Sequence, residues 1–410
     1  MARVAPVEGE QRPPRRDLTQ QTVHLLSGPV VAWNRLLGRG CGSRGVRFEG
    51  ATWTKYVLAA CCNGTGHLTQ AKVIFDTLRG LGYECAGVIL EKGISQKLRD
   101  EVIAPMAVPV LVLDGVQLVD RRGAISTLTL ALRGARFSAG LAAMGRECRA
   151  FVKDAAFCVS CWHYSLALLL STTARAKTRV LHVAPQFALA PRQFPRSGGL
   201  RESAWRGGLL ALQDIFRATG SCASVGDALP PLLEPPPPYA GRKADQKRIV
   251  LCYFLAAGAA DALSAAVAAA DVADAEFHVF SDPPTTCANL VAHAKSRAEF
   301  RELFERCDAV VCSAGNETVW EAVCRGVPTL AVPTTGHAEQ VLNAACHARR
   351  FPALVRSSAA PTAADVAWLL AGAAGSDAAA AESRDLRAFV ATRRDALRAA
   401  VEDLRDSRAY

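Results

Sequence analysis

The sequence predicts an α/β fold of two domains, each built on a parallel β-sheet. The chain has 410 residues, whereas a single hydrophobic core rarely grows beyond roughly 250–300 residues. Short apolar runs alternate with segments of helical period, which is typical of parallel sheets covered by helices. The alternation restarts after a proline-rich stretch at 230–238, as expected where one domain is connected to the next.

The N-terminal half contains five short apolar runs that predict strands. Between the first two, apolar residues recur at helical spacing, and two glycines mark the end of this helix. The predicted strands lie at 55–61, 84–90, 108–113, 157–160 and 178–184, and the helix lies at 68–81.

The C-terminal half repeats the pattern and ends in a long charged helix. Strands are predicted at 248–255, 276–280, 309–312 and 329–332, and helices at 262–270, 300–306, 317–324, 340–350 and 379–405. The predicted organisation is a basic, flexible extension (1–51), an N-terminal domain (52–228), a linker (229–246), a C-terminal domain (247–376) and a terminal helix (377–410). We expect the two sheets to face each other across a cleft, where such proteins bind ligands.

Composition limits the partners that the chain can have. The net charge of +10 permits an anionic partner, but basic and aromatic residues do not alternate and no nucleic-acid module is recognisable, so nucleic acid is disfavoured. Cys158 and Cys161 have the spacing of a redox or zinc pair, yet no second pair accompanies them. We therefore interpret them as buried thiols and expect no metal site.

No apolar run is long enough to span a membrane. The segment 18–37 predicts an amphipathic helix that either lies on an anionic membrane surface or packs on the protein. We expect a cytoplasmic protein, with peripheral membrane contact as an option. An organellar address is kept as an alternative, although the acidic residues Glu8, Glu10 and Asp17 disfavour it.

A turn of small residues follows the strand at 309–312 and precedes a helix. Small side chains let a ligand approach the backbone closely, and the N–H groups at a helix N-terminus suit a diphosphate. Glu317 and Glu321 lie one turn apart on one face of that helix, where a carboxylate can accept hydrogen bonds from a ribose diol. The candidate diphosphate and ribose residues are Ser313, Ala314, Gly315, Asn316, Glu317, Thr318 and Glu321.

A second polar loop follows the next strand, at 332–340. Open α/β sheets place ligands at the carboxyl ends of their strands. The side chains of Glu339 and Gln340 suit sugar hydroxyls.

The stretch 304–348 resembles the C-terminal signature of the family-28-like glycosyltransferases of GT-B fold, which have two Rossmann-like domains. This group includes the bacterial peptidoglycan N-acetylglucosaminyltransferase and plant galactolipid synthases, and the sequence is more similar still to uncharacterised predicted glycosyltransferases. The resemblance implies that 313–318 contact the diphosphate, Glu321 the ribose, and Glu339 and Gln340 the donor sugar. By the same resemblance, His337 either contacts phosphate or the donor sugar or caps the following helix. The matching residues are Ser313, Gly315, Glu317, Thr318, Glu321, Gly326, Pro328, Pro333, Gly336, His337, Glu339, Gln340 and Asn343.

The residues Asn63, Gly64, Thr65, Gly66 and His67 resemble the first glycine-rich loop of this fold. His67 is the candidate general base, since its ordinary pKa suits removal of a proton from an acceptor hydroxyl.

Three further segments match the family less well. His163 and the segment of His182 and Gln186 occupy strand ends where related sequences have polar residues near the acceptor; we interpret both histidines as packing residues. The stretch 254–261 has one glycine where many relatives have a glycine-rich phosphate loop, which puts a phosphate contact there in doubt.

The resemblance implies transfer of a hexosyl group from a nucleotide-diphosphate sugar, with a UDP-sugar as the co-substrate and no other cofactor. We expect inversion and metal independence, because the sequence has no Asp-x-Asp motif and a helix dipole can stabilise the leaving diphosphate. A glycan, a lipid-linked molecule and a small molecule remain open as acceptors. The alternatives are a nucleotide-sugar epimerase of the same fold and a non-catalytic subunit that binds nucleotide sugars.

Overall fold

The computed structural model describes most of the chain from residue 53 onwards. The predicted extension, its candidate amphipathic helix, and Asn63, Gly64 and Thr65 lie outside the described residues. The described ranges are 53–62, 66–114, 143–172, 179–189, 200–242, 246–254, 257–281, 290–294, 296–335, 337–372 and 376–407.

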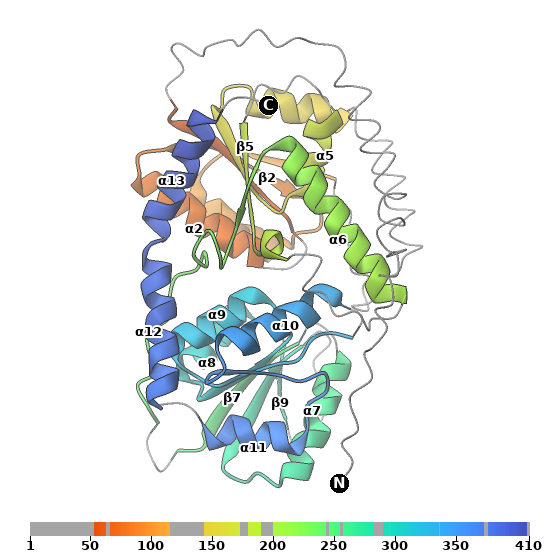
Figure 1. The fold of residues 1–410 in the computed structure, drawn as a ribbon, viewed down its shortest axis with the longest axis vertical. Helices are drawn as coiled ribbons and strands as arrows, with labels where there is room; N and C mark the ends of the chain where they lie inside the picture. Colours follow the sequence, from red (N-terminus) through yellow and green to blue (C-terminus); the bar gives the residue numbers. More distant parts are fainter. Residues whose placement is uncertain are drawn as a thin grey trace, which may run out of the picture. The chain divides into compact units, whose positions relative to one another are not determined.

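The first sheet has six parallel strands in the order β3-β2-β1-β4-β5-β6. Figure 1 labels β2 and β5 of this sheet. In the central strand β1, every residue except the first is buried, because helices cover both faces of the sheet. The strands are β1 (Lys55–Ala60), β2 (Glu84–Glu91), β3 (Val110–Leu113), β4 (Phe157–Cys161), β5 (Arg179–Ala184) and β6 (Ser221–Ser224).

Helix α2 (Gly66–Gly80) follows β1 and buries the face predicted by its apolar spacing, including Ala71, Ile74, Phe75 and Leu78. It begins at Gly66, so that His67 lies in its first turn. Further helices and helical turns of this half are α3 (Gln96–Leu98), η1 (Arg99–Ile103), η2 (Ala104–Met106), α5 (Tyr164–Thr172), η3 (Pro185–Ala188) and α6 (Leu200–Thr219), and residues 143–152 are also helical.

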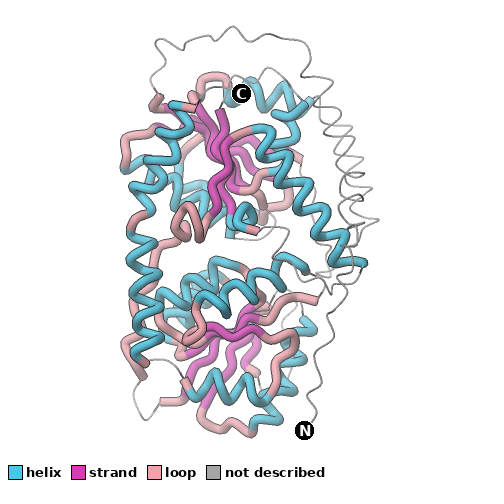
Figure 2. Tube along the Cα trace, viewed as in Figure 1, coloured by secondary structure: helices cyan, strands magenta, loops and turns pink. Residues whose placement is uncertain are grey.

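The second sheet also has six parallel strands, in the order β12-β11-β10-β7-β8-β9. Figure 2 shows the strands of both sheets in magenta between helices in cyan. The predicted fold class, α/β with two parallel sheets, is confirmed. The strands are β7 (Arg248–Tyr253), β8 (Ala275–Phe280), β9 (Val291–His293), β10 (Ala309–Cys312), β11 (Thr329–Ala331) and β12 (Val355–Ser357); the helices are α7 (Ala257–Ala270), α8 (Arg297–Arg306), α9 (Asn316–Arg325), α10 (Ala338–Arg350) and α11 (Ala363–Ala371).

The C-terminal tail forms two helices, not the single helix that the sequence predicts. Helix α12 (Asp377–Ala391) packs on α9, whereas α13 (Arg393–Asp406) packs on α2 and β5 of the first sheet. The break lies at Thr392, whose hydroxyl donates to the carbonyl oxygen of Phe389 at 2.8 Å. Such a local bond competes with the helical ladder, and α12 ends here.

The proline-rich segment is packed against the protein. Residues 230–242 contain neither helix nor strand, and the side chains of Leu232 and Leu233 are each 1% exposed. The Tyr239 hydroxyl donates to Asp308 at 2.5 Å, and the Tyr239 N–H donates to the Arg325 carbonyl at 2.7 Å. This connection is therefore anchored to the second sheet.

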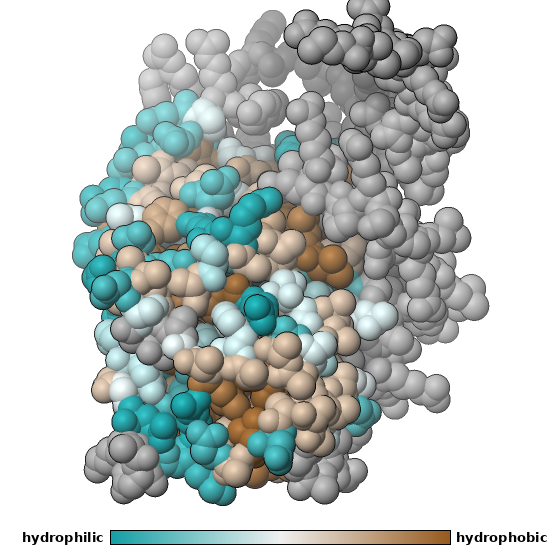
Figure 3. Space-filling view, turned by 60° about the horizontal axis from the view of Figure 1, so that its bottom comes forward, coloured by the Kyte–Doolittle hydropathy of each residue, from teal (hydrophilic) through white to brown (hydrophobic). Residues whose placement is uncertain are grey.

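The described surface mixes polar and apolar side chains. Figure 3 shows one face of the molecule, on which hydrophilic and hydrophobic residues are interspersed. Among the described residues, the exposed large hydrophobic side chains are Val112 and Val291, on two different strands. No helix in the described part of the chain is both long and apolar enough to cross a membrane.

Candidate functional site

The turn between β10 and α9 leaves a helix N-terminus without a side-chain cap. Gly315 is the N-cap residue, with φ −77° and ψ 144°, and as a glycine it has no side chain that could cap the first N–H groups of α9. Among the described residues, a Cβ at Gly315 would meet only the Ser313 carbonyl oxygen, at 3.8 Å, so no side chain crowds this point of the turn. The N–H groups of the first turn and the helix dipole together suit an anion.

Helix α10 holds this turn in place. The Asn343 side-chain amide donates to the carbonyl oxygen of Ala314 at 3.3 Å. His347 Nε2 lies 2.8 Å from Asn316 Oδ1, and burial lowers the pKa of His347 to about 3. Because Oδ1 can only accept, the neutral imidazole donates from Nε2. The side-chain oxygen of Asn316 is thus engaged by α10.

Glu321 lies in the second turn of α9 and is 7% exposed. Burial raises its pKa, while the nearby Arg301 and Arg297 lower it. Arg301 Nη2 lies 3.0 Å from Glu321 Oε1. The pair gives the site a carboxylate that can accept hydrogen bonds.

Glu317 points toward the first sheet. The Gln70 amide of α2 donates to Glu317 Oε1. A Cβ at Gly66 would lie 2.5 Å from Glu317 Oε2, so the carboxylate lies directly against the backbone of Gly66. Burial raises the pKa of Glu317. The structure therefore brings Glu317 to the first turn of α2, which also contains His67.

His67 is a neutral imidazole in this setting. Burial lowers its pKa to about 4, and a hydrogen bond with Gln70 opposes that shift in part. Within the described part of the chain, its Nδ1 has no hydrogen-bond partner. A neutral ring with an unused nitrogen can accept a proton.

The loop before α10 is closed by its own side chains. His337 is the N-cap of α10, and its Nδ1 accepts from the Gln340 N–H at 3.4 Å. Gln340 Oε1 accepts from the Thr334 N–H at 2.8 Å. Of the two roles considered for His337, the structure thus shows the capping role, whereas Gly336 lies outside the described residues.

Glu339 meets a glutamine of the first sheet. The Gln186 amide, in η3 after β5, donates to Glu339 Oε1 at 3.0 Å. Burial raises the pKa of Glu339 to about 7; the bond from Gln186 lowers it and the charge of Glu317 raises it. Glu317 on α9 and Glu339 on α10 therefore each accept a hydrogen bond from a glutamine of the N-terminal half.

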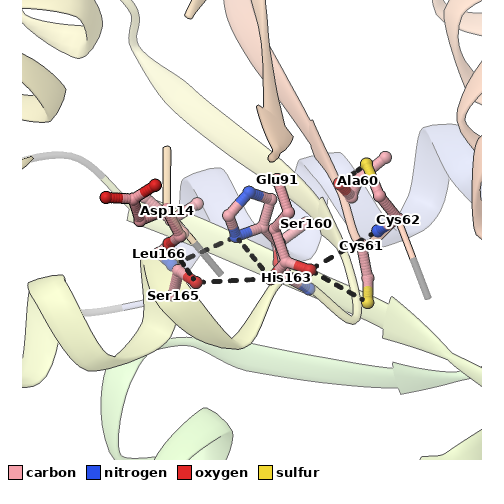
Figure 4. Close-up of polar contacts among 9 residues, drawn as sticks. All are labelled: Ala60, Cys61, Cys62, Glu91, Asp114, Ser160, His163, Ser165 and Leu166. Atoms are coloured by element: carbon pink, nitrogen blue, oxygen red, sulfur yellow. Dashed lines mark hydrogen bonds and ion pairs between the residues drawn. The ribbon is translucent and has the colours of Figure 1, made fainter. Parts of the chain in front are cut away.

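A further buried carboxylate, Glu91, was missed by the sequence analysis (Figure 4). It ends β2, is 1% exposed, and burial raises its pKa to about 7. Its carboxylate accepts from Cys61 Sγ at 3.4 Å, Cys62 N at 3.5 Å and Ser165 Oγ at 3.3 Å. The only signal in the sequence was an acidic residue that ends an apolar run.

The histidines that we interpreted as packing residues are buried. His163 lies 3.8 Å from Glu91 and accepts from the Leu166 N–H at 3.1 Å through Nδ1. His182 contacts Thr219 at 3.0 Å. Cys158 and Cys161 are free thiols within β4. In the described ranges, no group of three or more potential ligands could hold a metal ion, and metal independence stays a prediction.

Comparison with known proteins defines the class of fold. Residues 225–355 match the family model described as Glycosyl transferase family 1, and no curated protein matches the sequence. The structure of LpCGTa in complex with UDP aligns with a TM-score of 0.57 and 16% identity, over 86% of this chain and 99% of that one.

Two other solved structures are similar. Arabidopsis thaliana UGT89C1, complexed with quercetin, gives a TM-score of 0.56 and 13% identity over 85% of this chain and 99% of that one. CalG4, the calicheamicin glycosyltransferase, gives a TM-score of 0.53 and 14% identity over 85% of this chain and 96% of that one. The two sheets thus have the GT-B architecture of glycosyltransferases.

Proposed function

We propose that the protein transfers a hexosyl group from a nucleotide-diphosphate sugar, specifically a UDP-sugar, to an acceptor hydroxyl. The observation that carries the proposal is the N-terminus of α9, which begins with a glycine cap and whose Glu317 lies against Gly66 beside His67, with the buried Glu321 one turn further along the helix. The family match over 225–355 covers α9 itself. The UDP in the LpCGTa structure and the resemblance of 304–348 to family-28-like enzymes favour the same donor.

In this proposal the diphosphate, the ribose and the sugar of the donor each have binding residues on α9 or α10. The diphosphate binds the backbone N–H groups of 316–318, where the helix dipole stabilises negative charge. The ribose diol donates to Glu321, and the sugar contacts Glu339 and Gln340. His337 supports these residues by capping α10.

The chemistry is a direct displacement with inversion at the anomeric carbon. Neutral His67 accepts the proton of the acceptor hydroxyl while the acceptor oxygen forms the new bond. The bond from the anomeric carbon to the diphosphate oxygen breaks, and the helix N–H groups stabilise the leaving diphosphate, so that no metal ion is required.

The acceptor belongs to one of three classes: a glycan, a lipid-linked molecule or a small molecule. We propose a cytoplasmic location, and the net charge of +10 favours contact with an anionic membrane surface if the acceptor is lipid-linked. No cofactor other than the UDP-sugar co-substrate is proposed.

The test combines a panel of UDP-sugars with acceptor mixtures and measures UDP release and sugar transfer by mass spectrometry. His67→Gln should bind UDP like the wild type and lose transfer by on the order of 10²–10⁴-fold. Conversion of a UDP-sugar to its epimer without an acceptor would instead identify an epimerase. Binding without any turnover would identify a non-catalytic subunit.

A further inference from the structure

Gln186 has an unusual hydrogen-bonding state. Its side chain is 5% exposed, and its amide nitrogen donates to Glu339 at 3.0 Å. Its carbonyl oxygen Oε1 is buried and has no hydrogen-bond partner among the described residues. Buried acceptors are usually satisfied, so an unsatisfied one calls for a missing donor.

The backbone around Gln186 is braced. The Gln213 amide of α6 donates to the Gln186 carbonyl at 2.5 Å and to the Leu189 carbonyl at 3.1 Å. The neighbouring Phe187 packs edge-on against Trp162 and Phe216, with ring centroids 5.3 and 5.6 Å apart. The side chain of Gln186 therefore extends from a rigid support, and Oε1 is held at a fixed place.

Gln186 is also linked, through its partner Glu339, to the turn at the N-terminus of α9. Its partner Glu339 is one helical turn before Asn343 on α10, and Asn343 bonds to Ala314 in the turn before α9. The charge of Glu317, in the first turn of α9, acts on Glu339. A group attached to a diphosphate on this helix N-terminus would therefore lie near the pair of Gln186 and Glu339.

We propose that Gln186 determines sugar specificity: its Oε1 accepts a hydrogen bond from a hydroxyl of the donor sugar while its amide orients Glu339. The inference rests on the proposed function and adds a contact from the first sheet. The ionised carboxylate and the amide oxygen are both hydrogen-bond acceptors, which suits a group rich in hydroxyls. A sugar that lacks the matching hydroxyl leaves Oε1 unsatisfied and binds more weakly.

The test is calorimetric titration of the full chain with UDP and with a panel of UDP-sugars that differ at single hydroxyls. Gln186→Met keeps the length of the side chain and removes both polar atoms. We expect it to bind UDP like the wild type and to lose about tenfold or more of the affinity for the preferred UDP-sugar. Gln96→Met, at an exposed glutamine of α3, is the control and should change neither affinity.

Three results would overturn the inference: a wild type that binds no UDP-sugar more tightly than UDP, an unchanged sugar affinity in Gln186→Met, or an equal loss for UDP and UDP-sugars. The last result would indicate a structural role, and thermal unfolding of the variant would show it independently. A wild type that binds no nucleotide at all would instead overturn the proposed function, and the inference with it.

Discussion

Arg301 Nη2 lies 3.0 Å from Glu321 Oε1, and this ion pair links α8 to the second turn of α9. The Arg301 side chain is 37% exposed and that of Glu321 is 10% exposed, so the carboxylate is the more desolvated partner. Burial raises the pKa of Glu321, and Arg301 is one of two arginines that lower it again in part. The pair therefore helps to keep Glu321 ionised.

Removing Arg301 should make nucleotide binding depend on pH. In Arg301→Ala the pKa of Glu321 rises further, so the carboxylate of the variant begins to take up a proton at a higher pH than that of the wild type. As the pH is lowered, the affinity for UDP should fall by about 1 kcal/mol more than in the wild type, a small effect because solvent reaches the arginine. Arg301→Lys keeps the charge and should follow the wild type. Parallel pH profiles for Arg301→Ala and wild type would exclude this role.

Gly66 should be required for activity because of the group that lies against it. A Cβ there would approach Glu317 Oε2 to 2.5 Å and push the carboxylate away from Gln70. Gly66→Ala should therefore reduce transfer on the order of tenfold with little loss of stability, because a side-chain end can move. The measurement is the initial rate of UDP release with saturating donor.

Gly80→Ala is the matched control for Gly66→Ala at the other end of α2. A Cβ at Gly80 has no atom within 4 Å, so this variant should gain up to about 1 kcal/mol of stability with an unchanged rate. If both variants had the wild-type rate, the contact between Gly66 and Glu317 would have no part in catalysis.

Glu91 should lower the stability of the protein as the pH rises. Burial raises its pKa from 4.5 to about 7, so the folded protein keeps a proton that the unfolded chain loses near its ordinary pKa. The contribution of Glu91 to the free energy of unfolding is therefore fully favourable below about pH 4.5 and is lost as the pH rises through 7. At roughly 1.36 kcal/mol per pH unit, the loss amounts to about 3 kcal/mol.

The measurement is urea unfolding of the wild type and Glu91→Gln between pH 4.5 and pH 8. The free energy of unfolding of the variant, relative to the wild type, should increase by up to about 3 kcal/mol across that range. Comparing the two proteins removes the separate contributions of the buried histidines. Glu84→Gln, at the exposed start of the same strand, is the control. A difference that stays constant with pH would show that Glu91 is already ionised in the folded protein.

The sequence predicts the central strands because these are buried apolar runs. β1, β4 and β10 are almost wholly buried, and their residues are apolar almost throughout. The edge strands β6, β9 and β12 were missed, since solvent reaches them and polar residues interrupt them. Helix α6 was missed as well; it carries Gly207 and Gly208 in its middle, which weaken the helical signal.

For the candidate site, the sequence predicts the local geometry and not the contacts between the sheets. Small residues before α9 indicate a helix N-terminus with little side chain around it, and the structure has Gly315 as the N-cap residue. Gln70 and Glu317 are 247 positions apart, and Gln186 and Glu339 are 153 apart. Nothing in either local pattern specifies the partner, because the packing of one sheet's helices against the other determines it.

The central claim is that this chain binds a nucleotide diphosphate at α9, and calorimetric titration with UDP tests it most directly. The wild type should bind UDP, and Glu321→Ala should lose about 1.5–3 kcal/mol of binding free energy, because the ribose loses a charged hydrogen-bond partner. Absence of UDP binding by the wild type, or equal affinity in Glu321→Ala, would contradict the donor site described for α9.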